Sequence, residues 1–385
     1  MMNFKFSEEH NMLRDMVRKF VDQDVKPIAA RIDKEKAIPD ELLKKAADLG
    51  LMGIPFPEEY GGSDLGETGA CIMLEELGHG CASTAVTISA HQSLAGSSIY
   101  LDGTDEQKEK YLVPLAKGEK LGAFALTEPE AGSDAASIKT SAVRDGDDFV
   151  INGTKIWITN GNNADIIVVF AVTDPKLGAR GGVSAFIVES NTSGFKVGTI
   201  EEKMGIRGST TAELIFEDMR VSMDNMLGVY GAGFITAMKA LDIGRLSLGA
   251  AALGASKELL DLSLKFSKER KQFNLPICEH QAVQFMLAEM NEKIYAMEGM
   301  VFRTANMVDN GEKFTRESAI VKIFCSEALD WIVDAAVQIH GGLGYMSHYP
   351  VERFYRDSRI NRIFEGSNEI QKLVIAKELI KRGTH

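Results

Sequence analysis

The segment from Arg362 to Ile370 combines the residue types that a proton abstraction requires. It reads R-I-F-E-G-S-N-E-I, so Glu365 follows an isoleucine and a phenylalanine. Apolar neighbours desolvate a carboxylate and raise its pKa toward the range of a general base. Gly366 allows the backbone to approach a ligand closely. The pattern predicts a catalytic carboxylate, although taken alone it also fits a loop glutamate before a capped helix.

A helix is expected to begin directly after this carboxylate. It can start from Ser367 or Asn368, and Asn368 and Gln371 stand at the spacing of a capping box. The free N–H groups of such a helix start favour an electron-rich oxygen. Three residues predict the apolar face of the helix: Ile370, Leu373 and Val374.

Two strings in the middle of the chain also fit a ligand site. An apolar strand with Phe124 and Leu126 ends at Thr127 and leads into a Pro/Gly turn with Ser133, which can offer N–H and hydroxyl groups to an anion. Trp157 and Thr159 alternate onto one face of a strand, where they suit a flat heteroaromatic cofactor. The alternatives are a plain strand-to-turn connection and a core tryptophan.

The helical C-terminal half contains further candidates, each with a purely structural alternative. Asp242 and Arg245 share a helix face and could form a weak i,i+3 ion pair. Arg270 and Gln281 belong to polar stretches that could bind a pyrophosphate and an adenine, or could be solvated surface. Gln338 to Tyr345 ends a helix in a turn with Gly341 and Gly342, as an ordinary C-cap does.

Composition narrows the class of protein. The 385 residues are too many for one ordinary core, and 45% hydrophobic with 25% charged residues is typical of a soluble globular protein. A net charge of −12 argues against nucleic-acid binding. The four cysteines and seven histidines show no zinc or disulfide spacing. No apolar run approaches membrane-spanning length and the N-terminus resembles no signal or transit peptide, so we expect a cytoplasmic protein without membrane insertion.

Helical periodicity at both ends and strand-like runs between them predict three domains. The expected division is a helical domain over 1–120, a β domain over 121–230 and a helical bundle over 231–385. Asn152-Gly153 between two apolar runs predicts a hairpin turn. The predicted fold class is thus α+β multidomain, with a barrel- or sandwich-like middle domain.

Several enzyme classes have no support, since a Walker A sequence, a Rossmann fingerprint and a Gly-x-Ser-x-Gly motif are all missing. Over its whole length the chain instead resembles the acyl-CoA dehydrogenases. The motifs that carry the resemblance are L-T-E-P with G-S-D, K-I-W-I-T-N-G, Gln338 with Gly341-Gly342, and F-E-G-S-N at 364–368. The resemblance implies an N-terminal helical domain, a middle β domain and a C-terminal four-helix bundle, with FAD and acyl-CoA at their junction.

The resemblance also implies a mechanism and assigns residues to it. Glu365 would remove the pro-R α-proton of an acyl-CoA while the β-hydrogen leaves as a hydride to flavin N5, which gives a trans-2-enoyl-CoA. The N–H of Glu365 and a ribityl hydroxyl would polarise the thioester carbonyl. The residues implied to bind FAD are Phe124, Leu126, Thr127, Ser133, Trp157, Ile158, Thr159, Arg270, Gln281, Gln338, Gly341, Gly342, Ser367, Asn368 and Glu369. Those implied to bind the substrate are Ser133, Asp242, Arg245 and Gly366.

The implied partners are an acyl-CoA substrate, an electron-transfer flavoprotein and further copies of the chain, as a tetramer built from two dimers. Relatives that carry the base on the earlier helix have it where this chain has Gly244, so Glu365 is expected to act alone. The stretch 83–93 contains no arginine, which disfavours a dicarboxylic acyl chain and leaves short, branched-short or medium chains.

Two departures and two alternatives remain. Asn274 stands where relatives usually have glycine, and Glu130 replaces a common small residue; the sequence gives no account of Asn274. An acyl-CoA oxidase or a flavin monooxygenase on the same fold is the first alternative, and oxidases tend to be longer. A non-catalytic homologue that binds FAD or a partner is the second.

Overall fold

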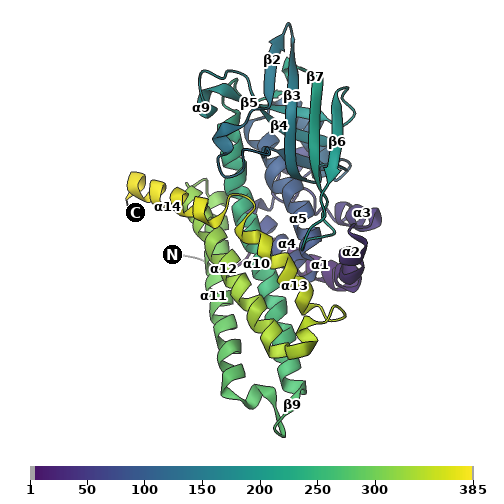
Figure 1. Cartoon of the computed structure of the whole chain (residues 1–385), viewed down its shortest axis with the longest axis vertical. Coiled ribbons are helices and arrows are strands. Elements are labelled where there is room, and N and C mark those ends of the chain that lie inside the picture. The colour runs from purple at the N-terminus through teal and green to yellow at the C-terminus, as the bar shows by residue number, and fades with distance from the viewer. Residues whose placement is uncertain (1–4, 384–385) are drawn as a thin grey trace.

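The computed structural model describes residues 5–383. Helices occupy both ends of the chain and strands its middle, as the sequence predicts. In Figure 1 the strands of the middle segment gather at one end of the long axis, and the long helices of the C-terminal half run from beside them to the opposite end. The chain is therefore elongated, and residues at the two ends of the bundle are far apart.

The N-terminal helices form as their capping residues predict. The Ser7 side chain accepts the His10 N–H at the start of the first helix, and acidic residues lie in its first turn and basic ones in its last. The α-helices are α1 (Glu8–Phe20), α2 (Ala29–Glu35), α3 (Asp40–Asp48), α4 (Gly66–Gly80), α5 (Ala82–Ser89), α6 (Ser97–Asp102), α7 (Asp105–Gln107) and α8 (Val113–Ala116). Between them lie the π-helical turns η1 (Val21–Val25), η4 (Ala90–Gly96) and η5 (Lys108–Leu112), and the 3-10 turns η2 (Lys26–Ile28) and η3 (Glu58–Tyr60).

The middle segment folds into one sheet of eight strands, ordered β6-β7-β3-β2-β4-β5-β8 with β1 paired to β4. The β1–β4 and β2–β4 pairs are parallel and the others antiparallel. The strands are β1 (Gly122–Ala125), β2 (Ser141–Asp145), β3 (Asp148–Thr159), β4 (Ile166–Val172), β5 (Val183–Glu189), β6 (Phe195–Ile200), β7 (Thr211–Ser222) and β8 (Met226–Leu227). Short turns η6 (Ala135–Ser137), α9 (Ala179–Gly182) and η7 (Met223–Asn225) connect them.

The prediction of a hairpin turn at Asn152-Gly153 is wrong. Strand β3 runs straight through these residues, and the tight turn lies earlier, at Gly146 and Asp147, where Gly146 has φ +65°. Gly153 instead sits at a bulge against β7, packed so closely on Thr140 that a Cβ would lie 2.5 Å from its hydroxyl. The long pairing of β3 with β7 outweighs the local turn preference of Asn-Gly.

The C-terminal bundle is built on one long helix packed through small residues. A Cβ at Gly254 would lie 1.7 Å from the Glu75 carbonyl, and one at Gly78 would lie 2.2 Å from the Ala251 carbonyl, so α4 crosses this helix at close range. The helices are α10 (Gly233–Glu269), α11 (Gln281–Asp309), α12 (Thr315–His340), α13 (Val351–Ser358) and α14 (Asn368–Arg382). The hairpin β9 (Lys271–Gln272) and β10 (Leu275–Pro276) and the turns η8 (Ile277–Glu279), η9 (Gly341–Tyr345) and η10 (Arg359–Arg362) complete the domain.

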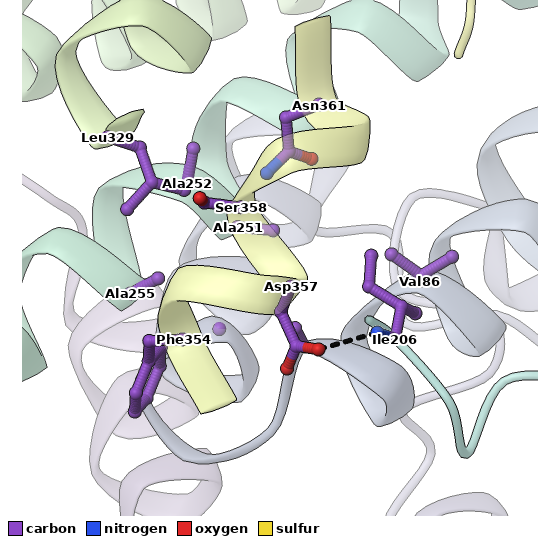
Figure 2. A pocket seen from close by; sticks show the side chains of 12 residues that line it. Val86, Ile206, Ala251, Ala252, Ala255, Leu329, Phe354, Asp357, Ser358 and Asn361 are labelled. Carbon is purple, nitrogen blue, oxygen red and sulfur yellow. Dashed lines mark hydrogen bonds between the residues drawn. The ribbon is translucent and has the colours of Figure 1, made fainter. Parts of the chain in front are cut away.

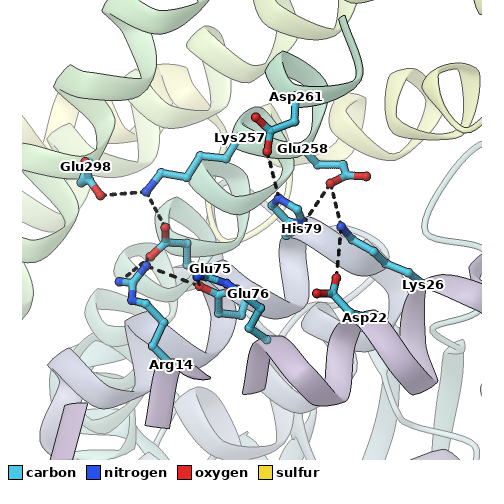
Figure 3. Close-up of polar contacts among 11 residues, drawn as sticks. Arg14, Asp22, Lys26, Glu75, Glu76, His79, Lys257, Glu258, Asp261 and Glu298 are labelled. Carbon is cyan, nitrogen blue, oxygen red and sulfur yellow. Dashed lines mark hydrogen bonds and ion pairs between the residues drawn. The ribbon is translucent and has the colours of Figure 1, made fainter. Parts of the chain in front are cut away.

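A network of ion pairs joins the N-terminal helices to this bundle (Figure 3). The Lys257 ammonium lies 2.6 Å from Glu75 and 2.7 Å from Glu298, while Arg14 reaches Glu75 from the opposite side at 3.0 Å. The Glu75 side chain is almost fully buried, so its charge depends on these two cations for compensation. These contacts fix α1 and α4 against α10 and α11.

Among the described residues, no helix is both long and apolar enough to cross a membrane.

Candidate active site

Glu365 lies in a tight connection between η10 and α14. Its φ is +55° and that of Gly366 is +86°, so a glutamate adopts the left-handed region directly before a glycine. Side-chain donors hold both carbonyls: Arg245 (3.3 Å) and Gln371 (3.2 Å) donate to the Glu365 oxygen, and Lys322 (2.9 Å) and Gln371 (3.1 Å) to that of Gly366. The unusual backbone is thus determined by its surroundings, as at many functional sites.

The Glu365 carboxylate is held against helix α10 at Gly244. A Cβ at Gly244 would lie 2.5 Å from Oε2 of Glu365 and 2.7 Å from a methyl carbon of Leu94. Oε2 is buried and has no hydrogen-bond partner among the described residues. Burial raises the pKa of Glu365 to about 7, against the opposing charges of Arg245 and Lys322. The carboxylate can therefore both hold and release a proton near neutral pH.

Helix α14 begins from Ser367, one of the two predicted starts, but without the predicted capping box. Ser367 is the N-cap, and its side chain faces the Ile370 N–H, so the capping box expected from Asn368 and Gln371 does not form. Asn368 is instead buried and bonds to Lys322 (2.8 Å), and Gln371 turns back to the two carbonyls already described. Both residues therefore brace the Glu365 connection. Glu369 is exposed in the first turn of α14.

Asp242 and Arg245 form a buried ion pair. The two side chains meet at 2.6 Å, the Thr315 hydroxyl donates to the second Asp242 oxygen at 2.6 Å, and both residues are at most 8% exposed. The pair is therefore not the solvated surface pair of the structural alternative, and it orients the guanidinium that holds Glu365. That the two residues also bind substrate remains a prediction.

Trp157 is presented to solvent on strand β3. It is 60% exposed, while Ile158 is buried and Thr159 half-buried; a shared face of Trp157 and Thr159 stays a prediction. Its φ of +57° coincides with a bulge against β7 between Lys155 and Ile158. An exposed indole held by a sheet is well suited to stack on a flat ring.

Hydrogen bonds and an ion pair hold the Leu126–Glu128 segment against the residues just before this tryptophan. Ile156 N–H donates to the Thr127 carbonyl at 2.9 Å. The fully buried Lys155 donates to the Leu126 carbonyl (2.9 Å) and pairs with Glu128 (2.7 Å). Burial lowers the pKa of Lys155 to about 8, while Glu128 opposes that change. Phe124 packs on Phe170 beneath this segment, and Ser133 is exposed in the following turn.

Helix α5 and turn η4 connect the tryptophan strand to the carboxylate. Asn160, next to Thr159, donates to the Thr87 carbonyl in α5 at 3.1 Å and to the Gly122 carbonyl at 3.2 Å. Leu94, in η4, is the residue that meets Gly244 beside Glu365. One continuous helical segment thus contacts both the end of strand β3 and the surroundings of Glu365.

A second group of predicted cofactor residues lies far from Glu365. Its members are exposed and gather at the β9 end of the bundle (Figure 1). Arg270 directly follows the end of α10, which places it about 39 Å along that helix from Gly244. The two groups of predicted cofactor residues therefore lie well apart within one chain. The members are Arg270, Gln281, Gln338, Gly341 and Gly342.

The structure accounts for the two departures from the family pattern. Asn274 forms the β9–β10 turn together with Phe273, with φ +65° and +52°, and asparagine adopts this left-handed region more readily than most residues. It thus meets the backbone requirement that glycine would meet. Glu130 is exposed in its turn and pairs with Lys139 on the surface.

Three family models match the chain in sequence order. The N-terminal domain of acyl-CoA dehydrogenases matches residues 7–119, the middle domain residues 123–219 and the C-terminal domain residues 231–380. The chain belongs to the acyl-CoA dehydrogenase family. As a member it is a flavoprotein oxidoreductase that uses FAD, and the exposed Trp157 beside a secured strand end fits that cofactor.

Its relatives include both dehydrogenases and reductases. The chain is 47% identical to an acryloyl-CoA reductase (NADH) of Anaerotignum propionicum, over 99% of this chain and 97% of the relative. It is 46% identical to a short-chain specific acyl-CoA dehydrogenase of Clostridium acetobutylicum, over 99% and 100%. A chain in a solved structure described as the electron transferring flavoprotein of Acidaminococcus fermentans superposes with a TM-score of 0.97 and 43% identity, over 99% and 100%.

Proposed function

We propose that Glu365 removes the pro-R α-proton of a saturated acyl-CoA, so that a trans-2-enoyl-CoA is formed. The observation that carries this proposal is the buried, unpaired Oε2 atom of Glu365 over Gly244. Burial raises the pKa of this carboxyl to about 7, which suits a base that works near neutral pH. Glycine at 244 leaves the rival base position without any side chain.

Polarisation of the thioester carbonyl would come from the same residue. The amides of Ile363 and Phe364 both donate to the Ile360 carbonyl, whereas no acceptor within residues 5–383 is found for the Glu365 N–H. A free N–H beside the carboxylate can stabilise the negative charge that develops on the carbonyl oxygen as the α-proton leaves. Because Gly366 has no side chain, the substrate could approach the backbone closely at this point.

FAD, when bound, would supply the hydride-accepting chemistry for the β-hydrogen. The Trp157 indole and the half-buried Thr159 would hold the ring on one side, and the Phe124–Thr127 segment on another. Ile158 anchors the strand between them, and Ser133 would contact pyrophosphate and CoA. We assign Ser367, Asn368 and Glu369 to the cofactor through the helix start, and Asp242 and Arg245 to the substrate side.

Anaerobic titration with butyryl-CoA tests this assignment. The purified protein should be yellow, and addition of substrate should bleach the flavin absorbance as enoyl-CoA forms. A protein that takes up no FAD, or whose flavin stays oxidised with every saturated acyl-CoA tried, contradicts the proposal. Release of hydrogen peroxide in air would instead favour the oxidase alternative.

The activity should rise with pH through the Glu365 ionisation. Below a pKa of about 7 the carboxyl is protonated and cannot accept the α-proton, so kcat/KM should be low in acid and level off in mild base. The positive charge of Lys322 stabilises the ionised form of Glu365. Lys322→Met should therefore move the rise of kcat/KM to higher pH. Lys377 is exposed, and Lys377→Met is the matched control, which should leave the pH of this rise unchanged. A profile that is flat across the region around pH 7 would remove Glu365 as the titrating base.

The reverse direction is a second candidate, which the identity to an acryloyl-CoA reductase favours. The same carboxyl, once protonated, would return the α-proton to a 2-enoyl-CoA by microscopic reversibility. We propose an electron-transfer flavoprotein as redox partner in either direction, which the likeness to the Acidaminococcus fermentans chain supports. Rates with butyryl-CoA and oxidised partner, against crotonyl-CoA and reduced partner, decide which direction is faster.

We propose short or branched-short acyl chains as substrates, with medium chains next. The identity to a short-chain specific relative supports this range, and the absence of arginine in the stretch 83–93 disfavours a distal carboxylate. A kcat/KM series over straight and branched acyl-CoAs orders these substrates. We also propose domain boundaries at 120/121 and 230/231 and a cytoplasmic location.

We propose that the active unit contains at least two chains and that the assembly is a tetramer of two dimers. The separation of about 39 Å along α10 supports this, because the Arg270 group of one chain must serve the FAD of another. Arg270→Ala should lose FAD affinity and Glu365→Gln should lose turnover. Coexpression of both variants should restore activity, since a mixed dimer contains one site with an intact Glu365 and an intact Arg270. Mixed assemblies as inactive as either parent would contradict shared sites.

A further inference from the structure

The segment 201–210 between β6 and β7 belongs to the β domain but is enclosed by both helical domains. On the N-terminal side, Gly208 N–H donates to the Ser83 hydroxyl at 3.1 Å. On the C-terminal side, the segment lies on helix α13 so closely that a Cβ at Gly205 would be 2.2 Å from the Arg356 carbonyl. All three parts of the chain therefore meet at this segment.

Asp357 makes the hydrogen bond at the centre of this junction (Figure 2). Its carboxylate accepts the Ile206 N–H at 2.5 Å, and the residue is only 5% exposed. Ile206 has a φ of +49°, which is a genuine outlier for a β-branched residue and requires surroundings that hold it. A cavity of about 30 Å³, lined also by Ser358 and Asn361, lies beside the carboxylate.

One side of this bond leads directly to the base. Asp357 lies near the end of α13, which continues into η10 and then into the Glu365 connection. The Phe364 N–H donates to the Ile360 carbonyl at 3.1 Å, so the segment between Asp357 and Glu365 is short and held by a hydrogen bond. A displacement of Asp357 would therefore be carried to Glu365.

The other side leads to the strand that faces the flavin. Four residues after Ile206, the Thr210 carbonyl accepts the Asn160 N–H at 3.1 Å. The chain then enters β7, where Thr211 pairs with Thr159. The bond from Asp357 thus lies between two short, ordered segments, one that ends at the base and one that ends beside Trp157.

We propose that Asp357 is a positioning residue that sets the placement of Glu365 relative to the flavin-facing strand β3 by holding the Ile206 N–H. This inference rests on the proposed roles of Glu365 and Trp157. It assigns to Asp357 no contact with substrate or cofactor. Its effect on the reaction is geometric, because misplacement of reacting groups by about 1 Å can cost on the order of 10²-fold in rate.

Rapid anaerobic flavin reduction by butyryl-CoA tests the proposal in three variants. Asp357→Ala and Asp357→Ser lack an oxygen that reaches Ile206, so the rate of flavin reduction should fall about 10- to 100-fold with FAD content and KM little changed. Asp357→Asn keeps a carbonyl oxygen that can accept the N–H, and its rate should stay within about threefold of the parent. The serine variant keeps a polar group in the junction. It replaces the alanine variant in the test if that variant does not fold.

Asp33→Asn is the matched control at the same junction. Asp33 binds Arg356, the neighbour of Asp357 on α13, through two bonds of 2.9 and 2.8 Å, and lies 3.9 Å from Arg207, but it makes no bond to Ile206. This variant should lower Tm without slowing flavin reduction. Equal slowing in Asp33→Asn, or parent-like rates in Asp357→Ala and Asp357→Ser, overturns the proposal.

The visible circular dichroism of bound FAD gives a second readout that needs no substrate. The Ala and Ser variants should change the flavin bands, and Asp357→Asn should restore them. If no acyl-CoA reduces the parent enzyme, the proposed reaction fails, yet the dichroism still decides about Asp357. Identical flavin bands in all variants would overturn the positioning role by themselves.

Discussion

Glu365→Gln should retain FAD and fold normally but reduce flavin with butyryl-CoA about 10⁴-fold more slowly than the parent enzyme. The carboxamide matches the carboxylate in shape, so the contacts at Gly244 and the bonds to the Glu365 carbonyl should persist. It cannot accept the α-proton, however, and no second carboxylate stands at residue 244 to replace it. Anaerobic stopped-flow absorbance measures the loss directly.

Glu378→Gln, on the same helix α14 as the site connection, is the control for this change. Glu378 interacts with Arg382 near the outer end of that helix, away from Glu365. Its rate should equal that of the parent. A Glu365→Gln enzyme that bleaches at a rate near the parent's would place the base elsewhere in the chain.

Gly244→Ala should slow flavin reduction about 10²-fold although it adds a single methyl group. That methyl would lie 2.5 Å from Oε2 of Glu365 and 2.7 Å from Leu94, both of which are closer than van der Waals contact allows. The carboxylate must therefore turn away from its position, and the reacting atoms lose alignment. The steady-state kcat with butyryl-CoA should fall far more than the FAD content.

Gly299→Ala provides the matched control within a helix of the same domain. No atom lies within 4 Å of a Cβ at Gly299, so the substitution is free of clashes. It should leave kcat unchanged and raise stability by about 0.5–1 kcal/mol, because alanine loses less backbone entropy than glycine in a helix interior. If both alanine variants kept full activity, the close packing of Glu365 on Gly244 would not matter for the reaction.

The sequence was a good guide to the site wherever chemistry and local geometry coincide. A carboxylate after apolar residues, followed by glycine and a capped helix, predicts a desolvated base, and burial does raise the pKa of Glu365. The sequence did not reveal Lys322, which holds this connection from helix α12, or Asp357, which bonds to Ile206 at the domain junction. One signal for Lys322 exists: it is a lysine on the buried stripe of α12, between Ala319 and Ser326, where a charged side chain needs partners.

Local preference does not predict the conformation where long-range pairing decides it. Asn152-Gly153 has a strong turn preference, yet β7 pairs along β3 through these residues and converts them into a bulge. The capping box at Asn368 failed for a similar reason, since Lys322 and Ser326 bind the Asn368 side chain inside the bundle. Such tertiary partners leave no periodic pattern in a single sequence.

Deuterium transfer to the α carbon of butyryl-CoA tests the role of Glu365 most directly. Butyryl-CoA is incubated anaerobically with the enzyme in D2O, and mass spectrometry follows label at C2. The parent enzyme should incorporate deuterium as Glu365 takes and returns the proton, and Glu365→Gln should bind the same substrate without incorporation. Equal labelling by the two enzymes would contradict the assignment of Glu365 as the base.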